Sequence, residues 1–428
     1  MDVVEAGKLG LAGKTIISND KNNFAPRIGA AYRPWGNDTV FRGGFGIYYD
    51  MGPRDINFGG LPYVLNEPAY TNPVANPAVI FPRVFPASGP EERITTVSLP
   101  AALNPHLKIP YSLQYNFTIE HSHWGTGFRL SYIGTAGRQG EWSYNINAPV
   151  PDARPYIEKT RRFPNYPDVN YLTNGAGHEY RAFTAQAERP LSHGLYFQIY
   201  WTWARDVGDL GRYDLSENPY DRRRERAVVS DTPTHRMNLH FTYQLPFGKS
   251  RRYLAQGSRA LDLLVGGWEL SGIFTAQTGR FLTPYWCGPD PTGTAFTGSI
   301  DPASVCIRPD QLRNPNLPSS ERTIQRWFDA DAFVRPPVGR FGTSAKGVIK
   351  GPGTNVWNAT FSKTFVFHEG GARLRLEMMA RNLFNHPNWS NPVTDISSGV
   401  AGRIFAAFGN FFDFSQIRQF RAGMRFEW

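Results

Sequence analysis

Several groups of polar residues have types and spacings that suggest chemistry. Residues 134–140 are glycine-rich like a phosphate-binding loop, but they lack the Lys-Ser/Thr pair that would hold phosphate and magnesium. His121 and His123 lack the ligand spacing of a zinc site. Asp329 and Asp331 could contribute to a calcium site, but the EF-hand spacing is missing. We therefore expect no catalytic residues, no metal site and no cofactor, and we predict that the protein is not an enzyme.

Cys287 and Cys306 are the two cysteines of the 428-residue chain, too few for a disulfide framework. Both lie in one stretch rich in glycine and proline. A disulfide between them would stabilise the fold by ~3 kcal/mol in an oxidising compartment. The sequence leaves two alternatives open, a disulfide or two free thiols.

The chain is basic, with a net charge of +10. Its densest basic run, residues 221–226, has acidic neighbours and lies in a loop-like stretch. These features favour a solvated surface segment over a nucleic-acid patch, because nucleic-acid binding requires basic residues gathered on one face. We expect no nucleic-acid partner.

Apolar and polar residues alternate along many segments, for example over residues 111–120. Period two places all apolar side chains on one face of a strand, whereas a helix would show a period of 3.6. We predict eleven strands, over residues 24–33, 38–50, 111–121, 126–135, 179–189, 194–204, 235–245, 266–278, 356–367, 371–383 and 416–428.

Most of these strands reach the ~9–11 residues needed to cross a bilayer, about twice the usual length in globular proteins. Their connections alternate between short and long, as in barrels with short periplasmic turns and long extracellular loops. The sequence therefore predicts an all-β fold, an antiparallel transmembrane β-barrel in which residues 1–428 form part of one domain. The expected extracellular loops lie near residues 51–110, 136–178, 205–234, 279–355 and 384–415.

The polar face of these strands must meet water, because charges facing lipid at mid-bilayer cost ~2–4 kcal/mol each. Ion pairing with Glu120, Glu188, Glu269 and Glu427 would stiffen the wall, whereas a positive field would favour anionic cargo. The side chains expected to line the lumen are Arg42, Arg129, Arg236, Arg373, Arg375, Glu377, Arg381, Arg421 and Arg425.

The last strand alternates up to an aromatic C-terminus, through Phe420, Met424, Phe426 and Trp428. We expect this strand to serve barrel assembly, with outer-membrane lipid and the barrel-assembly machinery as partners. Counting back from a periplasmic C-terminus places residues 1–23 outside the cell. Single-chain bacterial barrels have even strand numbers, so we expect an N-terminal part to be missing, unless residues 14–18 form a twelfth strand.

As a set, several motifs resemble the TonB-dependent receptors of the Oar-like type. The resemblance implies a 22-stranded outer-membrane barrel, of which this chain would be the C-terminal half, with a plug domain and a TonB-contacting segment that lie outside it. It implies barrel strands and turns, and no catalytic residues. The motifs are residues 23–29 (NFAPRIG), 41–50 (FRGGFGIYYD), 243–248 (YQLPFG), 267–272 (GWELSG), 351–353 (GPG) and 381–387 (RNLFNHP).

Three functions follow from these patterns. The first is a receptor fragment that takes up a scarce or bulky solute (a small molecule, glycan or peptide), energised by the TonB complex through the missing N-terminal region. The second is a cell-surface binding or adhesion barrel that acts through its loops. The third is a secreted, soluble all-β carbohydrate-active protein.

Overall fold

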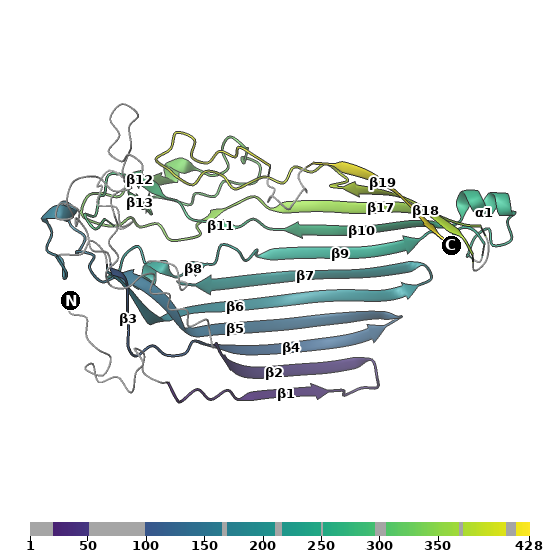
Figure 1. Cartoon of the computed structure of the whole chain (residues 1–428), viewed down its shortest axis with the longest axis horizontal. Helices are drawn as coiled ribbons and strands as arrows, with labels where there is room; N and C mark the ends of the chain where they lie inside the picture. Colours follow the sequence, from purple (N-terminus) through teal and green to yellow (C-terminus); the bar gives the residue numbers. More distant parts are fainter. Residues whose placement is uncertain are drawn as a thin grey trace, which may run out of the picture.

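The computed structural model describes residues 20–50, 99–164, 169–209, 216–249, 251–295, 305–367, 371–407 and 417–428. A 13-stranded sheet dominates it, and eleven of these strands follow one another as neighbours (Figure 1). Each pair along this path is antiparallel. The path consists of β1 (Arg27–Tyr32), β2 (Thr39–Tyr49), β4 (Tyr111–His123), β5 (Thr126–Asn145), β6 (Val169–Ser192), β7 (Leu195–Gly208), β9 (His235–Gln244), β10 (Trp268–Gln277), β17 (Thr354–Val366), β18 (Arg373–Arg381) and β19 (Gln419–Glu427).

These eleven strands occupy the segments that the alternation predicts, but two of them are much longer than expected. β5 continues to Asn145 and β6 begins at Val169, so nearly half of the loop expected over residues 136–178 is paired strand. The alternation fails there because Arg138 and Glu179 bring charges to the face that is apolar elsewhere. A strand with water on both faces has no reason to alternate.

The sheet also departs from purely antiparallel pairing. β3 (Leu99–Leu103) joins β6 in parallel, and the short β8 (Ala227–Val228) extends the sheet beside β7. β3 falls within the loop expected over residues 51–110, and β8 falls within the loop expected over residues 205–234. The twelfth strand considered over residues 14–18 lies outside the described residues.

The connection between β10 and β17 forms a small folded unit, which we call the loop module (residues 278–353). It contains the strand pairs β11–β16, β12–β13 and β14–β15. Phe328, Phe333 and Ile349 form one buried apolar cluster there, and Val305 and Ile307 belong to another. Its elements are β11 (Phe281–Leu282), β12 (Trp286–Gly288), β13 (Val305–Ile307), β14 (Asp310–Gln311), η5 (Ala330–Ala332), β15 (Phe333–Val334) and β16 (Ile349–Lys350), while η3 (Tyr156–Glu158) and η4 (Arg222–Glu225) lie in other long connections.

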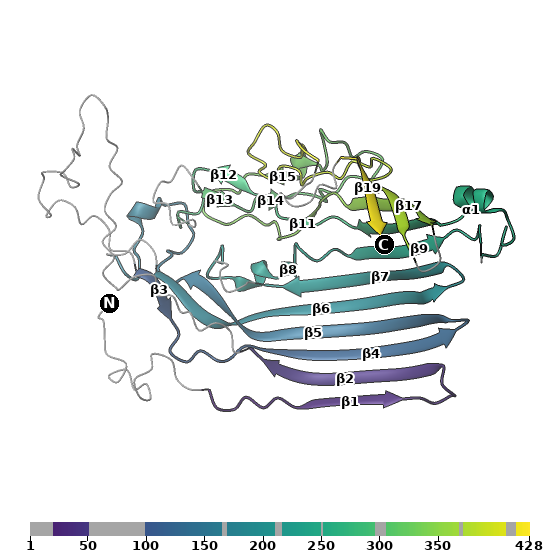
Figure 2. The same ribbon diagram turned by 45° about the vertical axis from the view of Figure 1, so that its right-hand side comes forward.

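The end of the sheet that lies opposite the loop module carries short turns. The C-terminus lies at this end together with α1 (Arg259–Val265), a short helix in the β9–β10 connection that the sequence analysis missed (Figures 1 and 2). Ser258 caps α1 by accepting a hydrogen bond from the Leu261 amide. Among the described residues, no helix has the length and apolar character needed to cross a membrane.

The apolar face of the sheet remains largely uncovered. Phe117, Phe128, Leu130 and Met378 are each more than two-fifths exposed, although they lie within well-paired strands. The apolar side chains predicted for the last strand share this face, because Met424 lies opposite Leu376 and Phe426 lies opposite Leu374. Phe420, Met424, Phe426 and Trp428 are all exposed. A face of this kind would be unstable in water over such an area and suits acyl chains.

Candidate functional site

The side chains predicted to line the lumen lie on one face of the sheet, which we call the polar face. Arg42 of β2 lies opposite Thr118 of β4, which lies opposite Ser131 of β5. The same row continues across β6 and β7 to Arg236 of β9. By the same alternation this face also carries Arg129, Arg373, Arg375, Glu377, Arg381, Arg421 and Arg425.

Some of these arginines are neutralised by carboxylates on the same face of the sheet. Glu120 accepts from Arg42 at 3.0 Å and from Arg129 at 2.8 Å. Arg375 lies 3.1 Å from Glu269 and 3.5 Å from Glu377, and Arg425 lies 2.8 Å from Glu427. Glu188 differs from the expectation, because its described partners are the amides of Gln186 and Gln198. The contacts of Glu120 join neighbouring strands, and the contact between Arg375 and Glu269 spans β17 from β18 to β10. The contacts of Glu377 and Glu427 each lie within one strand.

Other arginines of this face have no acidic partner in the part of the chain that the structure describes. They are Arg236, Arg373, Arg381 and Arg421. Arg381 and Arg421 border a cavity of about 440 Å³ between β7 and β19, which also exposes His240 and Asn358. Unneutralised guanidinium groups beside a water-filled space create a positive potential that attracts anions.

A larger cavity of about 1030 Å³ lies where the strands meet the long connections. One wall is the polar face of five strands, which contribute residues such as Tyr48, Ser112, His178 and Asp206. The other wall comes from the β7–β9 connection and the loop module, including Tyr285. The sheet therefore curls far enough for the loop module to face β2. Sequence reasoning missed this site because its two walls are far apart in the chain.

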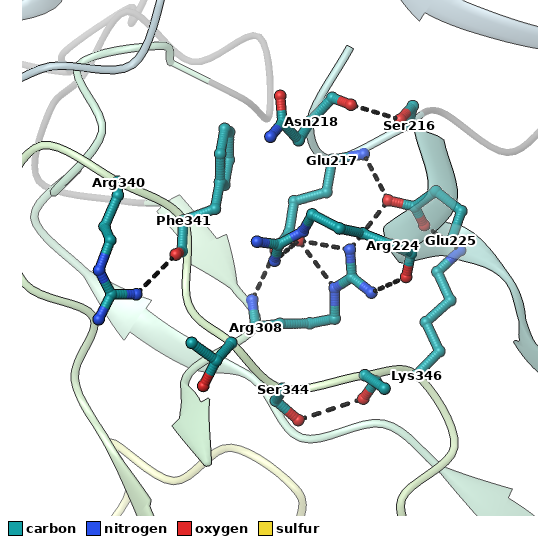
Figure 3. Close-up of polar contacts among 12 residues, drawn as sticks. Ser216, Glu217, Asn218, Arg224, Glu225, Arg308, Arg340, Phe341, Ser344 and Lys346 are labelled. Atoms are coloured by element: carbon teal, nitrogen blue, oxygen red, sulfur yellow. Dashed lines mark hydrogen bonds and ion pairs between the residues drawn. The ribbon is translucent and has the colours of Figure 1, made fainter. Parts of the chain in front are cut away.

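A buried ion network holds the two connections together (Figure 3). Arg308 of the loop module donates from Nε to Glu217 at 2.7 Å, and its terminal nitrogen lies 2.9 Å from Glu225. Lys346 lies 2.6 Å from the other oxygen of Glu225. Arg224 reaches Glu217 at 3.1 Å, and burial lowers the pKa of its guanidinium from the ordinary value. Glu217 and Glu225 belong to the β7–β9 connection, so the network fixes this connection against the loop module.

This network corrects the interpretation of residues 221–226 as a solvated segment. Arg223 is 93% exposed, as expected, but the side chain of Glu225 is completely buried. Glu217 and Arg308 are 91 residues apart in the chain, so no local pattern could reveal their contact. The run is part of the framework of the large cavity.

Cys287 and Cys306 are joined by a disulfide in the structure, with the sulfurs 2.04 Å apart. The two residues are paired between β12 and β13, and Cys306 borders the large cavity. The disulfide therefore braces the loop module next to the network of Arg308.

The other groups singled out in the sequence have structural partners. Asp329 binds Arg313 at 2.7 Å, and His121 lies within hydrogen-bonding distance of the Thr39 hydroxyl. Residues 134–140 lie within β5. In the described ranges, no three His, Cys, Asp or Glu side chains are grouped so that they could hold a metal ion.

Comparisons with known proteins extend this picture. Residues 2–421 match the family model "Outer membrane beta barrel domain". No curated protein matches the sequence. The solved structures similar to the chain include the outer membrane transporter YddB from Escherichia coli, at 12% identity and a TM-score of 0.44, with 90% of this chain and 38% of that chain covered.

Two further similar structures come from other organisms. The ferric enterobactin receptor PfeA from Pseudomonas aeruginosa has 12% identity and a TM-score of 0.42, with 94% of this chain and 40% of that chain covered. The iron transporter FrpB from Neisseria meningitidis has 10% identity and a TM-score of 0.40, with 94% and 39% covered. The chain thus spans about two-fifths of the length of these proteins.

The family model covers almost the whole chain, and the antiparallel sheet with one apolar and one polar face is the structure that such a family requires. A match to a family of outer-membrane domains leaves the alternative of a secreted, soluble protein without support. The chain belongs to the outer membrane β-barrel domain family and resides in the outer membrane as a β-barrel.

Proposed function

We propose that the chain is barrel wall from a TonB-dependent receptor that admits a scarce or bulky polar solute. The motifs quoted above resemble that class of receptor, and the polar face with its unpaired arginines suits a lumen for anionic cargo. The chain would supply the C-terminal half of a 22-stranded barrel. The energy would come from the TonB complex through a plug and a TonB-contacting segment that lie outside this chain.

The observation that carries this proposal is the large cavity at the loop end of the polar face. Its volume of about 1030 Å³ suits a small molecule or a segment of glycan or peptide. Tyr48 and Tyr285 offer ring faces and hydroxyl groups to a polar ligand. Oδ1 of Asp206 is buried without a hydrogen-bond partner among the described residues, so a hydroxyl or amino group of the cargo could donate to it.

Uptake by living cells tests the proposal. Cells that express the complete gene, cells that lack it and cells that lack TonB are grown in the same rich medium, and the depletion of solutes is followed by mass spectrometry. We expect one class of solute to disappear only when both the gene and TonB are present. Depletion that needs the gene but not TonB would contradict the energised mechanism.

The charge of the lumen has a separate test in liposomes that contain the protein purified from outer membranes. Gluconate and glucose are matched in size and differ in charge, and we expect gluconate to enter faster because of the unpaired arginines. Replacing Arg381 and Arg421 with glutamine should remove this preference. Equal flux of the two solutes through the unaltered protein would contradict a positive lumen.

A surface binding or adhesion role is the second candidate, and the rigidity of the loop module favours it. A disulfide, two apolar clusters and a buried ion network fix the module in one shape, which a binding surface requires. Deleting residues 279–353 separates the roles. Loss of cell attachment with solute uptake intact would support adhesion, whereas loss of uptake alone would support the receptor.

A further inference from the structure

The apolar face of the sheet ends in a group of exposed arginines at the loop end, which we call the arginine rim. It consists of Arg138, Arg181, Arg205 and Arg226, gathered near Glu179. Arg138 lies 3.1 Å from Glu179, Arg181 lies 3.4 Å away and Arg226 lies 3.6 Å away. Arg205 lies directly opposite Arg181 on β7. Three guanidinium groups thus share the Glu179 carboxylate, and that of Arg205 is a fourth positive charge beside them.

The register fixes the height of the arginine rim on the sheet. One step below it, Tyr132, Phe183 and Trp203 form a row of aromatic residues across β5, β6 and β7. Arg181 and Arg205 occupy the next row on the same face, toward the long loops. Barrels carry aromatic girdles at the level of the membrane interface. With the long loops outside the cell, as the sequence predicts, the rim therefore lies where the headgroups of the outer leaflet begin.

The charges of the arginine rim are incompletely balanced. Arg181 and Arg205 are directly opposite each other on adjacent strands, an arrangement that is destabilising for like charges. Arg205 is exposed and has no acidic partner in the described ranges. The side chain of Arg181 is 58% exposed and shares Glu179 with two other arginines. An anion bound between Arg181 and Arg205 would remove this repulsion.

We propose that the arginine rim binds the phosphate groups of an outer-leaflet glycolipid whose acyl chains lie along the apolar face below. Guanidinium groups form paired hydrogen bonds with phosphate oxygens. The row of Tyr132, Phe183 and Trp203 continues the site toward the hydrocarbon region, which a free phosphate ion would not use. The proposal requires the outer-membrane location and the orientation with the long loops outside the cell, and it is independent of cargo and of TonB.

Native mass spectrometry of the protein, purified from outer membranes in a neutral detergent, tests the proposal. The probes are lipid A with both phosphates and the same lipid after dephosphorylation. Each arginine near an anionic surface contributes roughly fivefold to binding. We therefore expect the double variant R181Q/R205Q to bind the phosphorylated lipid about 25-fold more weakly than the unaltered protein, and we expect the dephosphorylated lipid to bind weakly to both.

The matched control is R252Q/R335Q, which loses the same charge at exposed positions outside the rim and should bind like the unaltered protein. Heat-modifiable gel mobility shows that each variant is folded. Equal binding of the phosphorylated lipid by R181Q/R205Q and the control would overturn the proposal. Displacement of the lipid by millimolar inorganic phosphate would also overturn it, because the site would then bind free anions.

Discussion

Ion pairs in this protein have different roles according to their burial. Glu120 forms ion pairs with Arg42 and with Arg129 on the polar face. Both arginine side chains are 53% exposed, so water reaches these pairs. Solvent screens such pairs, and each contributes about 1 kcal/mol or less. The side chains of Arg308 and Glu225 are buried, so losing one partner would leave an uncompensated charge away from water.

Replacing Arg308 with methionine should loosen the framework of the large cavity. Glu217 and Glu225 would lose their shared partner, at a cost of about 3 kcal/mol. We expect faster hydrogen exchange in residues 216–230 and 305–308. Arg223→Met is the control because that side chain is 93% exposed. Unchanged exchange in the Arg308 variant would show that Arg224 and Lys346 suffice to hold the network.

A second residue-level prediction concerns acid. Arg340 binds both oxygens of Asp310, at 2.6 and 2.8 Å, and the Thr343 amide donates to one of them at 2.9 Å. These contacts, with Arg340 the larger cause, hold the pKa of the Asp310 carboxyl below its usual value. The ionised form therefore stabilises the loop module above the unfolded pKa of ~3.9, and this contribution is lost as the pH falls through the folded pKa.

Asp310→Asn should remove the dependence of the loop module's stability on the ionisation of residue 310. The variant should be less resistant to proteolysis of the loop module than the unaltered protein at pH 7. The difference should shrink as the pH falls through the folded pKa, because the unaltered protein then becomes protonated at the same position. Acid-active pepsin at pH 2 and trypsin at pH 7 provide the two measurements. A difference of the same size at both pH values would contradict the role of Asp310.

At the scale of elements, the sequence predicted the strands well where one face meets lipid and the other meets water. The eleven segments are found in the expected order, because alternation is then imposed on every residue. The prediction from the sequence failed in the outer parts of β5 and β6 and at α1, where solvent surrounds the chain and no such constraint acts. The polar face was predictable by the same logic. The large cavity was not, because its walls meet only in the folded chain.

The turn before β10 supplies a prediction at this scale. Gly267 has φ +69°, and a Cβ built there would lie 2.2 Å from the carbonyl oxygen of Thr364. Gly267→Ala should therefore lower the free energy of unfolding by ~2 kcal/mol or more, since backbone strain and overpacking add. The midpoint of urea unfolding, read from gel mobility, measures the effect.

Gly399→Ala serves as the control. A Cβ at Gly399 would meet nothing within 4 Å, and the residue has no left-handed backbone conformation. This variant should unfold at the same urea concentration as the unaltered protein. If the two alanine variants unfold alike, the contact between Gly267 and Thr364 does not define the turn.

At the scale of the whole molecule, the sheet has two open edges within the described residues, at β1 and β19. Each edge presents unpaired backbone groups, which favour association with other strands. In a closed barrel no such edge remains. The pairing of the two edges could not be predicted from this sequence, because the alternation identifies strands and not the strands with which they pair.

The chain expressed alone in detergent should therefore aggregate. Co-expression with strands that pair with β1 and β19 should instead give a folded species that shifts on gels when heated. Size-exclusion chromatography with light scattering measures both samples. A monodisperse, folded 428-residue species would contradict the prediction and would mean that the sheet closes on itself.

The length of β6 determines what the exterior of the cell presents to its surroundings. The strand has 24 residues, whereas ~9–11 suffice to cross the bilayer. With the proposed orientation, its surplus stands beyond the headgroups together with β5 as a rigid ribbon. An antibody or a bacteriophage tail approaching the bacterium would touch this ribbon before any lipid, which makes it a ready epitope for recognising the intact cell.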